Sequence, residues 1–417
     1  MGVIGFGGYR ISIRSKEHKE ALVNALKAGI KLIDTSSNYT NGESEQLIGT
    51  VLKDYPEYQP IIVTKAGYIQ GVNLNHIVTD EDLVVISDHL KHSIHPQFLE
   101  DQLSRSLSRL QKDSVDVFLL HNPEYFFQTE NSSADVFYQR IKKAFVYLEE
   151  EVKNHRIKAY GISSNHFILP KTDSEWVSLE KVLEIANSIS KDHHFKYIQF
   201  PLNLIEIGAL EKFGEFPEMS LLEMAKLNNL ITISNRPLNA FSQNSLVRLA
   251  TYSEIIESLD EEKAEAQFNL VMKLIEAKWL EEHQKDGEAE IEKLEDVTLI
   301  KQFKDIWKQL PSPDSVDQVY FGNLFPFVAQ IWGGNLTVEE SQPFYELYEF
   351  SQKYSRKNLD SKARKFRDQA ISVGLIEEIN ERDFAKEVIA TYLNYGIDYV
   401  LVGMKKTEYV DQLKSLF

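Results

Sequence analysis

The chain has 417 residues, with 63 Asp and Glu against 46 Lys and Arg, a formal net charge of −17 and no cysteine. This acidic balance argues against general binding to nucleic acids or to anionic membranes, because both partners require a positive field. The absence of cysteine excludes disulfides, thiolate nucleophiles and metal sites built on cysteine.

The apolar content predicts a folded protein with a large core. Hydrophobic residues make up 43% of the chain, which is typical of globular proteins rather than of disordered chains. Residues 1–8 lack the basic start and the long apolar segment of a signal peptide. No apolar run reaches the roughly eighteen residues that a transmembrane helix requires. We therefore expect a cytoplasmic protein.

Short apolar runs of strand character alternate with longer segments of helical periodicity along the chain. In the first part, strands are expected at 3–6, 31–34, 61–65 and 115–121, and the helices that follow them at 17–28, 43–52, 96–110 and 136–152. A long polar loop separates the third strand from its helix. Further strands are expected at 159–162, 197–200, 230–234 and 399–402, and further helices at 178–189, 221–227, 385–395 and 407–416. Eight such strand–helix pairs predict an α/β fold with a closed parallel sheet, the (β/α)8 or TIM barrel.

The stretch 239–382 interrupts this alternation of strands and helices after the seventh strand. Within it, residues 254–296 hold fifteen Asp and Glu and five Lys, a local net charge of −10. Apolar residues still recur at helical spacing over 268–279 and 299–310, so this stretch is expected to form helices. We expect one barrel over 1–417, with 239–382 as a helical insertion that is not an independent domain.

Three successive strands end on polar residues that can carry chemistry. Asp34, Lys65 and His121 close the second, third and fourth strands, and Tyr39 lies in the loop after Asp34. The carboxyl ends of barrel strands converge on one face, so these side chains are expected to meet. A lysine ammonium lowers the pKa of a nearby tyrosine, an aspartate can hold that lysine, and a neutral histidine can orient a substrate oxygen. Such a set suits protonation of a carbonyl oxygen during reduction by a hydride, which a cofactor must supply.

Each of the four residues also has an ordinary structural explanation. Asp34 could cap a turn, Lys65 could be a surface lysine, and His121 could be a buried structural histidine. Tyr39 could be a loop aromatic. The combination at three consecutive strand ends favours a catalytic site.

These residues and their neighbours resemble the aldo/keto reductase superfamily. The resemblance covers 3–238, resumes near 383, and rests on the segments 32–39, 42–45, 63–65, 119–124 and 161–165. It implies a catalytic tetrad of Asp34, Tyr39, Lys65 and His121. It also implies NAD(P)-dependent reduction of an aldehyde or ketone to an alcohol, or the reverse reaction, with Tyr39 as general acid and base.

The same resemblance implies a nicotinamide cofactor, NADP(H) in preference to NAD(H). In the family, a Ser-Asn pair and a glutamine hydrogen-bond the nicotinamide carboxamide, and the matching residues are Ser164, Asn165 and Gln199. In the family, the first loop runs close to the nicotinamide ribose, which would explain Gly8 and Tyr9. A tight turn is the alternative explanation for Gly8. The other implied cofactor residues are Gly8, Tyr9, Asp34, Asn235, Arg236, Pro237, Leu238, Gly403, Lys405, Tyr409 and Gln412.

Some positions depart from the family pattern. Asn235 occupies the position at which a tyrosine often stacks on the nicotinamide, and an amide has no such aromatic face. Gly403 and Tyr409 occupy the positions of a Lys and an Arg that hold the 2′-phosphate in NADPH-preferring members. Lys405 and Lys406 are either substitute phosphate partners or solvated lysines, and in the second case NADH could be accepted.

The insertion begins after the seventh strand, on the side where catalytic loops emerge. We expect it to shape the substrate pocket or to clasp the cofactor, and the alternative is an acidic, solvated appendage. The expected ligand is a small carbonyl or alcohol, with no nucleic acid or membrane partner. A second function stays open, namely a cofactor-binding regulatory protein with little turnover that docks a partner through the acidic insertion. No metal site is expected, since the adjacent His193 and His194 are poorly placed to chelate one ion.

Overall fold

The computed structural model describes residues 2–79, 81–130, 132–212, 218–242, 245–250, 259–285, 294, 297–334, 336–374 and 384–417. The chain is divided into two compact units. One is formed by Met1–Leu246 together with Lys386–Phe417, and the other by Val247–Ala385. These boundaries lie within eight residues of the expected ends of the insertion, 239 and 382. That the insertion is not an independent domain stays a prediction.

The first unit contains a closed barrel of eight parallel strands, which confirms the predicted (β/α)8 fold. The strands, in their order around the barrel, are β1 (Val3–Gly7), β2 (Leu32–Asp34), β3 (Ile61–Ala66), β7 (Val115–His121), β8 (Ile157–Ser163), β9 (Phe195–Pro201), β10 (Ile231–Asn235) and β13 (Tyr399–Val402). The barrel closes because β1 pairs with β2 on one side and with β13 on the other.

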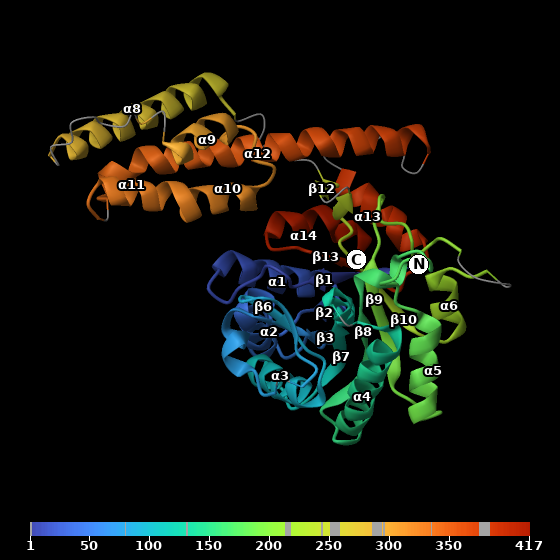
Figure 1. Ribbon diagram of the computed structural model, residues 1–417. Coiled ribbons are helices and arrows are strands. Elements are labelled where there is room, and N and C mark those ends of the chain that lie inside the picture. The colour runs from blue at the N-terminus through green and yellow to red at the C-terminus, as the bar shows by residue number, and fades with distance from the viewer. Residues whose placement is uncertain are drawn as a thin grey trace. The chain divides into compact units, whose positions relative to one another are not determined.

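Helices surround these strands, and Figure 1 shows α2 to α5 on the outside of the barrel. Serine side chains accept backbone hydrogen bonds at the starts of α1, α4, α5 and α6, as helix N-caps do. Pro96 lies in the first turn of α3, where its missing N–H is not needed. The helices are α1 (Lys16–Ala28), α2 (Glu43–Asp54), α3 (Pro96–Leu110), α4 (Ala134–Lys153), α5 (Leu179–Ile189), α6 (Leu221–Leu227), α13 (Phe384–Asn394) and α14 (Thr407–Leu413).

Two small antiparallel sheets were not expected from the sequence. The predicted polar loop before α3 contains a three-stranded sheet of β4 (Tyr68–Gln70), β5 (Val84–Ser87) and β6 (Leu90–His92). The insertion begins not with a helix but with a two-stranded sheet of β11 (Asn239–Ser242) and β12 (Ser245–Arg248). Neither sheet was predicted, because strands of three or four residues are too short to show a clear alternation.

The second unit is helical, as expected, and has a hydrophobic core of its own. Its helices are α8 (Glu261–Lys285), α9 (Thr298–Ile306), α10 (Pro313–Val319), α11 (Phe325–Ile331) and α12 (Val338–Ser372), with a π-helical turn, η6 (Tyr320–Leu324). Phe268 of α8 stacks on Trp307 with ring centroids 4.7 Å apart, and both belong to one buried cluster within this unit. No helix among the described residues is long and apolar enough to span a membrane.

Candidate active site

The strand residues of the candidate site point into the barrel because of the alternation of side chains along a strand. Five residues of the apolar cluster inside the barrel are Leu32, Val63, Leu119, Tyr197 and Ile233. Side chains two positions further along a strand lie on the same face, so they also point inward, at the carboxyl end. These residues are Asp34, Lys65, His121, Gln199 and Asn235.

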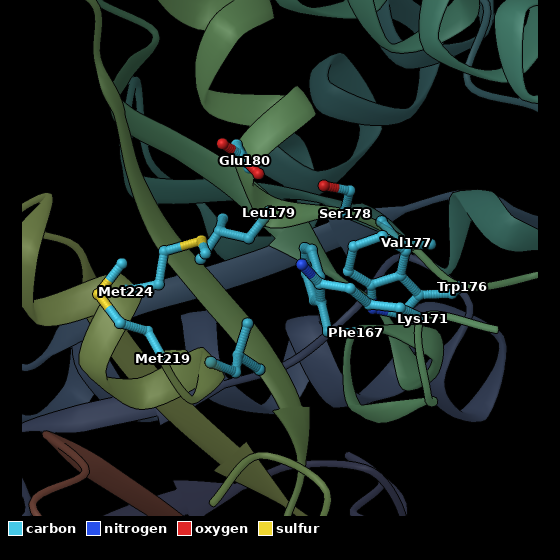
Figure 2. A pocket seen from close by; sticks show the side chains of 10 residues that line it. Phe167, Lys171, Trp176, Val177, Ser178, Leu179, Glu180, Met219 and Met224 are labelled. Atoms are coloured by element: carbon cyan, nitrogen blue, oxygen red, sulfur yellow. The ribbon is translucent and has the colours of Figure 1, made fainter. Parts of the chain in front are cut away.

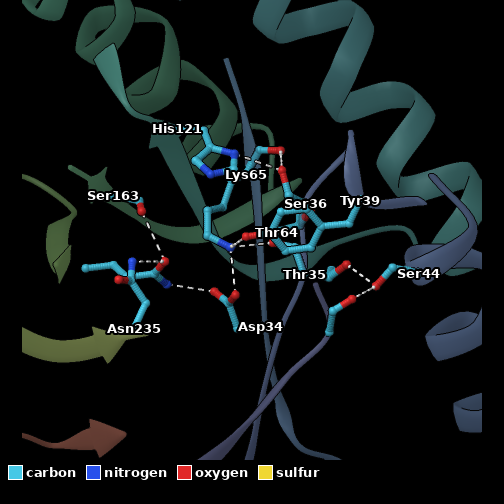
Figure 3. A network of polar contacts seen from close by, with 12 residues as sticks. Asp34, Thr35, Ser36, Tyr39, Ser44, Thr64, Lys65, His121, Ser163 and Asn235 are labelled. Atoms are coloured by element: carbon cyan, nitrogen blue, oxygen red, sulfur yellow. Dashed lines mark hydrogen bonds and ion pairs between the residues drawn. The ribbon is translucent and has the colours of Figure 1, made fainter. Parts of the chain in front are cut away.

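Lys65 is the centre of the polar network. Its Nζ atom lies 2.7 Å from Asp34 Oδ2, 2.7 Å from the Thr35 carbonyl oxygen and 3.4 Å from Tyr39 Oη. Lys65 and Asp34 are both buried, and Figure 3 shows the Lys65 amine between Asp34 and Tyr39. The structure thus brings a lysine ammonium, its carboxylate partner and a phenol together, as the sequence predicted.

Burial controls the protonation of these groups. It raises the pKa of Asp34 and lowers the pKa of Lys65, and the ion pair between them opposes both shifts. Burial, with a smaller contribution from the negative charge of Asp34, raises the pKa of Tyr39 well above its ordinary value. Burial therefore outweighs the lowering of this pKa that was expected from Lys65. The phenol carries its proton at neutral pH, as a proton donor must.

His121 also contacts Tyr39, with ring centroids 5.9 Å apart in an edge-on arrangement. Burial, and then the charge of Lys65, lowers the pKa of His121 well below its ordinary value. The imidazole is therefore neutral at physiological pH. His92 of β6 donates from Nε2 to the His121 carbonyl oxygen at 2.7 Å, so the unexpected small sheet supports this strand end.

Sequence reasoning missed Ser36, which holds the His121 ring. The Ser36 hydroxyl oxygen lies 3.0 Å from His121 Nδ1 and 2.6 Å from Asn38 Oδ1. Ser36 is fully buried. Its position two residues after Asp34, in the loop that also carries Tyr39, was the signal that could have identified it.

Glu45 belongs to the segment 42–45 that resembles the family, but no role was predicted for it. The structure shows one. It is fully buried and accepts hydrogen bonds from Thr64 Oγ1 and from Arg109 Nε, the second at 2.6 Å. Thr64 precedes Lys65 on β3. Glu45 therefore fixes α2 and α3 against the strand that carries the lysine.

Gln199 joins the tetrad network more closely than expected. Its Nε2 donates to Asp34 Oδ1 at 2.7 Å, and its Oε1 accepts from Ser163 Oγ at 3.0 Å and from Asn235 Nδ2 at 3.3 Å. These contacts from β8, β9 and β10 are drawn in Figure 3. The amide that was expected to contact a cofactor thus binds the Asp34 carboxylate in this structure.

The expected Ser-Asn pair lies beside Gln199. The Ser164 N–H donates to the Gln199 carbonyl oxygen at 2.9 Å, and Asn165 Oδ1 accepts from Arg236 Nη2 at 3.4 Å. Asn165 and Arg236 both line a groove of about 580 Å³, a volume within the range of ligand sites. Arg236 also pairs with Glu206 across 2.7 Å. Pro237 is buried and Leu238 is half-buried after it.

Gly8 lies against β2 with no space for a side chain, which differs from the tight turn given as the alternative explanation. Its N–H donates to the Asp34 carbonyl oxygen at 2.8 Å, and a Cβ atom at this position would lie 2.8 Å from the same oxygen. The neighbouring Tyr9 is 60% exposed and contacts the edge of the Tyr39 ring. The first loop is therefore tied to the strand that carries Asp34.

The remaining expected cofactor residues form a separate group after β13. Gly403 and Lys405 are exposed in the segment between β13 and α14, and Tyr409 and Gln412 lie on α14. Because β13 is next to β1 in the barrel, this group lies on the side of the barrel where Gly8 and Tyr9 begin the first loop.

A small cavity lies apart from these residues, near the start of α5 and α6 (Figure 2). Its volume is about 30 Å³, which is room for about one water molecule. None of the expected site residues lines it. The lining residues are Phe167, Lys171, Trp176, Val177, Ser178, Leu179, Glu180, Met219, Leu221 and Met224.

Comparison with known proteins gives one family. The model of the aldo/keto reductase family matches residues 1–245, more than half of the chain. The chain is 27% identical to the NAD(P)H-dependent D-xylose reductase of Scheffersomyces stipitis, over 58% of this chain and 74% of that protein. It is 26% identical to the NADH-specific methylglyoxal reductase of Escherichia coli, over 35% of this chain and only 40% of that protein.

Among solved structures, the glycerol dehydrogenase of Gluconobacter oxydans matches 99% of this chain and 86% of its own, at 17% identity and a TM-score of 0.48. The family match covers every residue of the expected tetrad, together with Gln199 and Asn235. The chain belongs to the aldo/keto reductase family of oxidoreductases.

Proposed function

We propose that this protein reduces an aldehyde or ketone to an alcohol, or catalyses the reverse reaction, with a nicotinamide dinucleotide and with Tyr39 as general acid and base. The observation that carries the proposal is the buried Lys65 ammonium, 2.7 Å from Asp34 Oδ2 and 3.4 Å from Tyr39 Oη. Two relatives support it, since both are reductases that depend on NAD(P)H or NADH.

Each side chain has a distinct task in the direction of reduction. A bound nicotinamide dinucleotide supplies the hydride. Tyr39 gives its proton to the substrate oxygen as negative charge develops there. The ammonium of Lys65 then stabilises the phenolate that remains, and Asp34 holds that ammonium in place. In the reverse direction, the phenolate of Tyr39 accepts the proton of the alcohol.

The neutral His121 orients the substrate oxygen beside Tyr39. A charged imidazolium would compete with Tyr39 as the proton donor to the substrate oxygen. Because the His121 imidazole is neutral, the phenol of Tyr39 donates this proton. Ser36 keeps the ring in place through its contact with His121 Nδ1 at 3.0 Å. The substrate is therefore a small molecule whose oxygen reaches both Tyr39 and His121.

The residues at the barrel mouth fit a nicotinamide dinucleotide. The Oδ1 atom of Asn235 is buried and has no hydrogen-bond partner among the described residues, so a ligand that brings a donor suits it. Ser164, Asn165 and Asn235 would hold the nicotinamide end. Lys405 is exposed on the β13 side and would pair with a 2′-phosphate, which favours NADP(H) over NAD(H).

Tyr39→Phe tests the proposal. We expect turnover on a panel of aldehydes and ketones to fall by about 100- to 10,000-fold, with the affinity for NADPH, measured by fluorescence titration, within about twofold of wild type. Tyr58→Phe is the matched control, because it removes the hydroxyl of a tyrosine outside the expected site, between α2 and β3. Wild-type rates in Tyr39→Phe would contradict the assigned role. A wild-type protein that binds NADPH but reduces no carbonyl would favour the regulatory alternative.

A further inference from the structure

The orientation of the Gln199 amide is fixed by Asp34. The two oxygens of that carboxylate accept from Lys65 Nζ and from Gln199 Nε2, each at 2.7 Å. An ionised carboxylate only accepts hydrogen bonds, so the amide nitrogen of Gln199 must face Asp34. Its Oε1 atom therefore points away from Asp34, toward β8 and β10.

The Gln199 oxygen in turn fixes the orientation of Asn235. Gln199 Oε1 accepts from Ser163 Oγ at 3.0 Å and from Asn235 Nδ2 at 3.3 Å. The two lone pairs of this oxygen are both used, so it has no capacity left for a ligand. Because the nitrogen of Asn235 faces Gln199, its oxygen faces the other way.

Asn235 Oδ1 is the acceptor at the end of this series of hydrogen bonds, in which Asn235 donates to Gln199 and Gln199 donates to Asp34. The atom is buried and has no donor within hydrogen-bonding distance in the described part of the chain. A buried acceptor without a partner is destabilising and is rare in native proteins. Asn235 ends β10 and follows the inward-pointing Ile233 by two positions, so a molecule bound at the barrel mouth can supply the missing donor.

We propose that Asn235 Oδ1 accepts a hydrogen bond from the carboxamide NH2 group of the nicotinamide. This inference rests on the proposed function only in requiring that the dinucleotide binds. In this chain, Asn235 replaces the stacking aromatic of the family by a hydrogen bond in the plane of its amide. It also takes the acceptor role that Gln199 cannot fill, because the Gln199 oxygen is occupied. The hydrogen-bond chain from Lys65 to Asn235 thus links the tetrad to recognition of the cofactor.

Binding of a matched pair of dinucleotides tests the proposal without any turnover. The 3-acetylpyridine analogue of NADP⁺ has a methyl group in place of the carboxamide NH2 and keeps the carbonyl. We expect wild type to bind NADP⁺ about tenfold more tightly than the analogue, as loss of one buried hydrogen bond implies. Asn235→Leu is expected to bind the two with equal affinity. Isothermal titration calorimetry gives each Kd directly.

Two further variants separate recognition from folding. Ser234→Ala is the matched control: its hydroxyl is also buried without a partner in the described residues, but it lies on the opposite face of β10, so the wild-type preference should persist. Asn235→Ala removes the same acceptor without adding bulk, and it should bind NADP⁺ and the analogue with equal affinity even if Asn235→Leu fails to fold. Phosphorylated ADP-ribose, which lacks the nicotinamide, should bind all folded variants equally.

The outcomes distinguish this inference from the proposed function. A tenfold preference that persists in Asn235→Leu, or that is absent from wild type, overturns the role of Asn235 while reduction of carbonyls can continue. Failure of wild type to bind either dinucleotide overturns both proposals. Equal binding by Asn235→Leu with a retained preference in Ser234→Ala supports the inference.

Discussion

The Lys65–Asp34 ion pair is buried, so each charge depends on the other for compensation. Removing one partner of such a pair leaves an isolated buried charge, whereas replacing both can be nearly neutral. We expect Asp34→Asn to lower the free energy of unfolding by about 3–5 kcal/mol. Combining it with Lys65→Met should recover much of that loss. Urea titration followed by circular dichroism checks this, and a double variant less stable than Asp34→Asn would contradict it.

His92 gives the protein a stability that depends on pH. Burial lowers the pKa of His92 to about 4, whereas the unfolded chain titrates near 6.5. Between these values the unfolded chain binds the extra proton, so stability is complete above about pH 6.5 and falls as the pH falls toward 4. The loss amounts to about 3 kcal/mol.

His92→Gln keeps a donor for the His121 carbonyl but cannot take up a proton. We expect the variant to lose about 3 kcal/mol less stability than wild type between pH 7 and pH 4. His92 is also a smaller cause of the low pKa of His121, so its replacement reduces the pH dependence of stability through His121 as well, in the same direction. Urea midpoints measured across this range give the comparison. Parallel pH profiles for the two proteins would contradict the role of His92.

The residues of the tetrad could be predicted from the sequence, but their contacts could not. Asp34, Lys65 and His121 each end a strand, and a parallel barrel brings strand ends together regardless of detail. The bond from Gln199 to Asp34 depends on rotamers and strand register, which no sequence pattern contains. The net upward shift of the Tyr39 pKa could not be predicted either, because the extent of burial becomes known only from the packed structure.

At the scale of secondary-structure elements, Gly161 allows β8 and β9 to lie close together. A Cβ atom at Gly161 would lie 1.9 Å from the Tyr197 carbonyl oxygen, and Tyr197 precedes Gln199 on β9 by two residues. We expect Gly161→Ala to destabilise the barrel by about 1–3 kcal/mol, as overpacking does, and to reduce turnover by moving Gln199.

Gly403→Ala is the matched control for this stability effect. A Cβ atom at Gly403 has no neighbour within 4 Å among the described residues, so its urea midpoint should equal that of wild type. A shift of the same size in both variants would show that space at Gly161 is not the cause. Unchanged stability of Gly161→Ala would show that β9 can move without loss.

The elements themselves were predicted to the extent that their periodicity was long. All eight barrel strands and the helices around them lie at the expected places, because buried apolar runs and amphipathic helices repeat over many residues. The sheet of β4, β5 and β6 was missed, although it supplies His92 to the site. Its strands have only three or four residues each, too few to show a clear alternation, and β4 pairs with β6 across about twenty residues of chain.

At the scale of the whole molecule, the insertion that makes the chain longer than a barrel alone also carries most of its net negative charge. Residues 254–296 account for −10 of the net charge of −17, and the second unit contains all of them. The apolar clusters of the two units share no residue. The rest of the chain has a net charge of only −7, and the contribution of the acidic segment to function has to be tested by its removal.

Replacing Val247–Ala385 by a flexible linker of glycine and serine tests whether the insertion takes part in binding. All eight strands of the barrel and its interior cluster lie outside this segment, so the shortened protein is expected to keep its far-ultraviolet strand signal and its dependence on Tyr39. If the insertion clasps the cofactor or shapes the substrate pocket, the Kd for NADPH should rise at least about tenfold, equivalent to about 1.4 kcal/mol, or the order of preference among carbonyls should change.

The same fluorescence titration and carbonyl panel measure both effects, and the Tyr39→Phe change made in the shortened protein controls for intact chemistry. Unchanged cofactor affinity together with unchanged carbonyl preference would make the insertion a solvated appendage. Loss of turnover with an unfolded barrel would instead show that the barrel depends on the insertion for its stability.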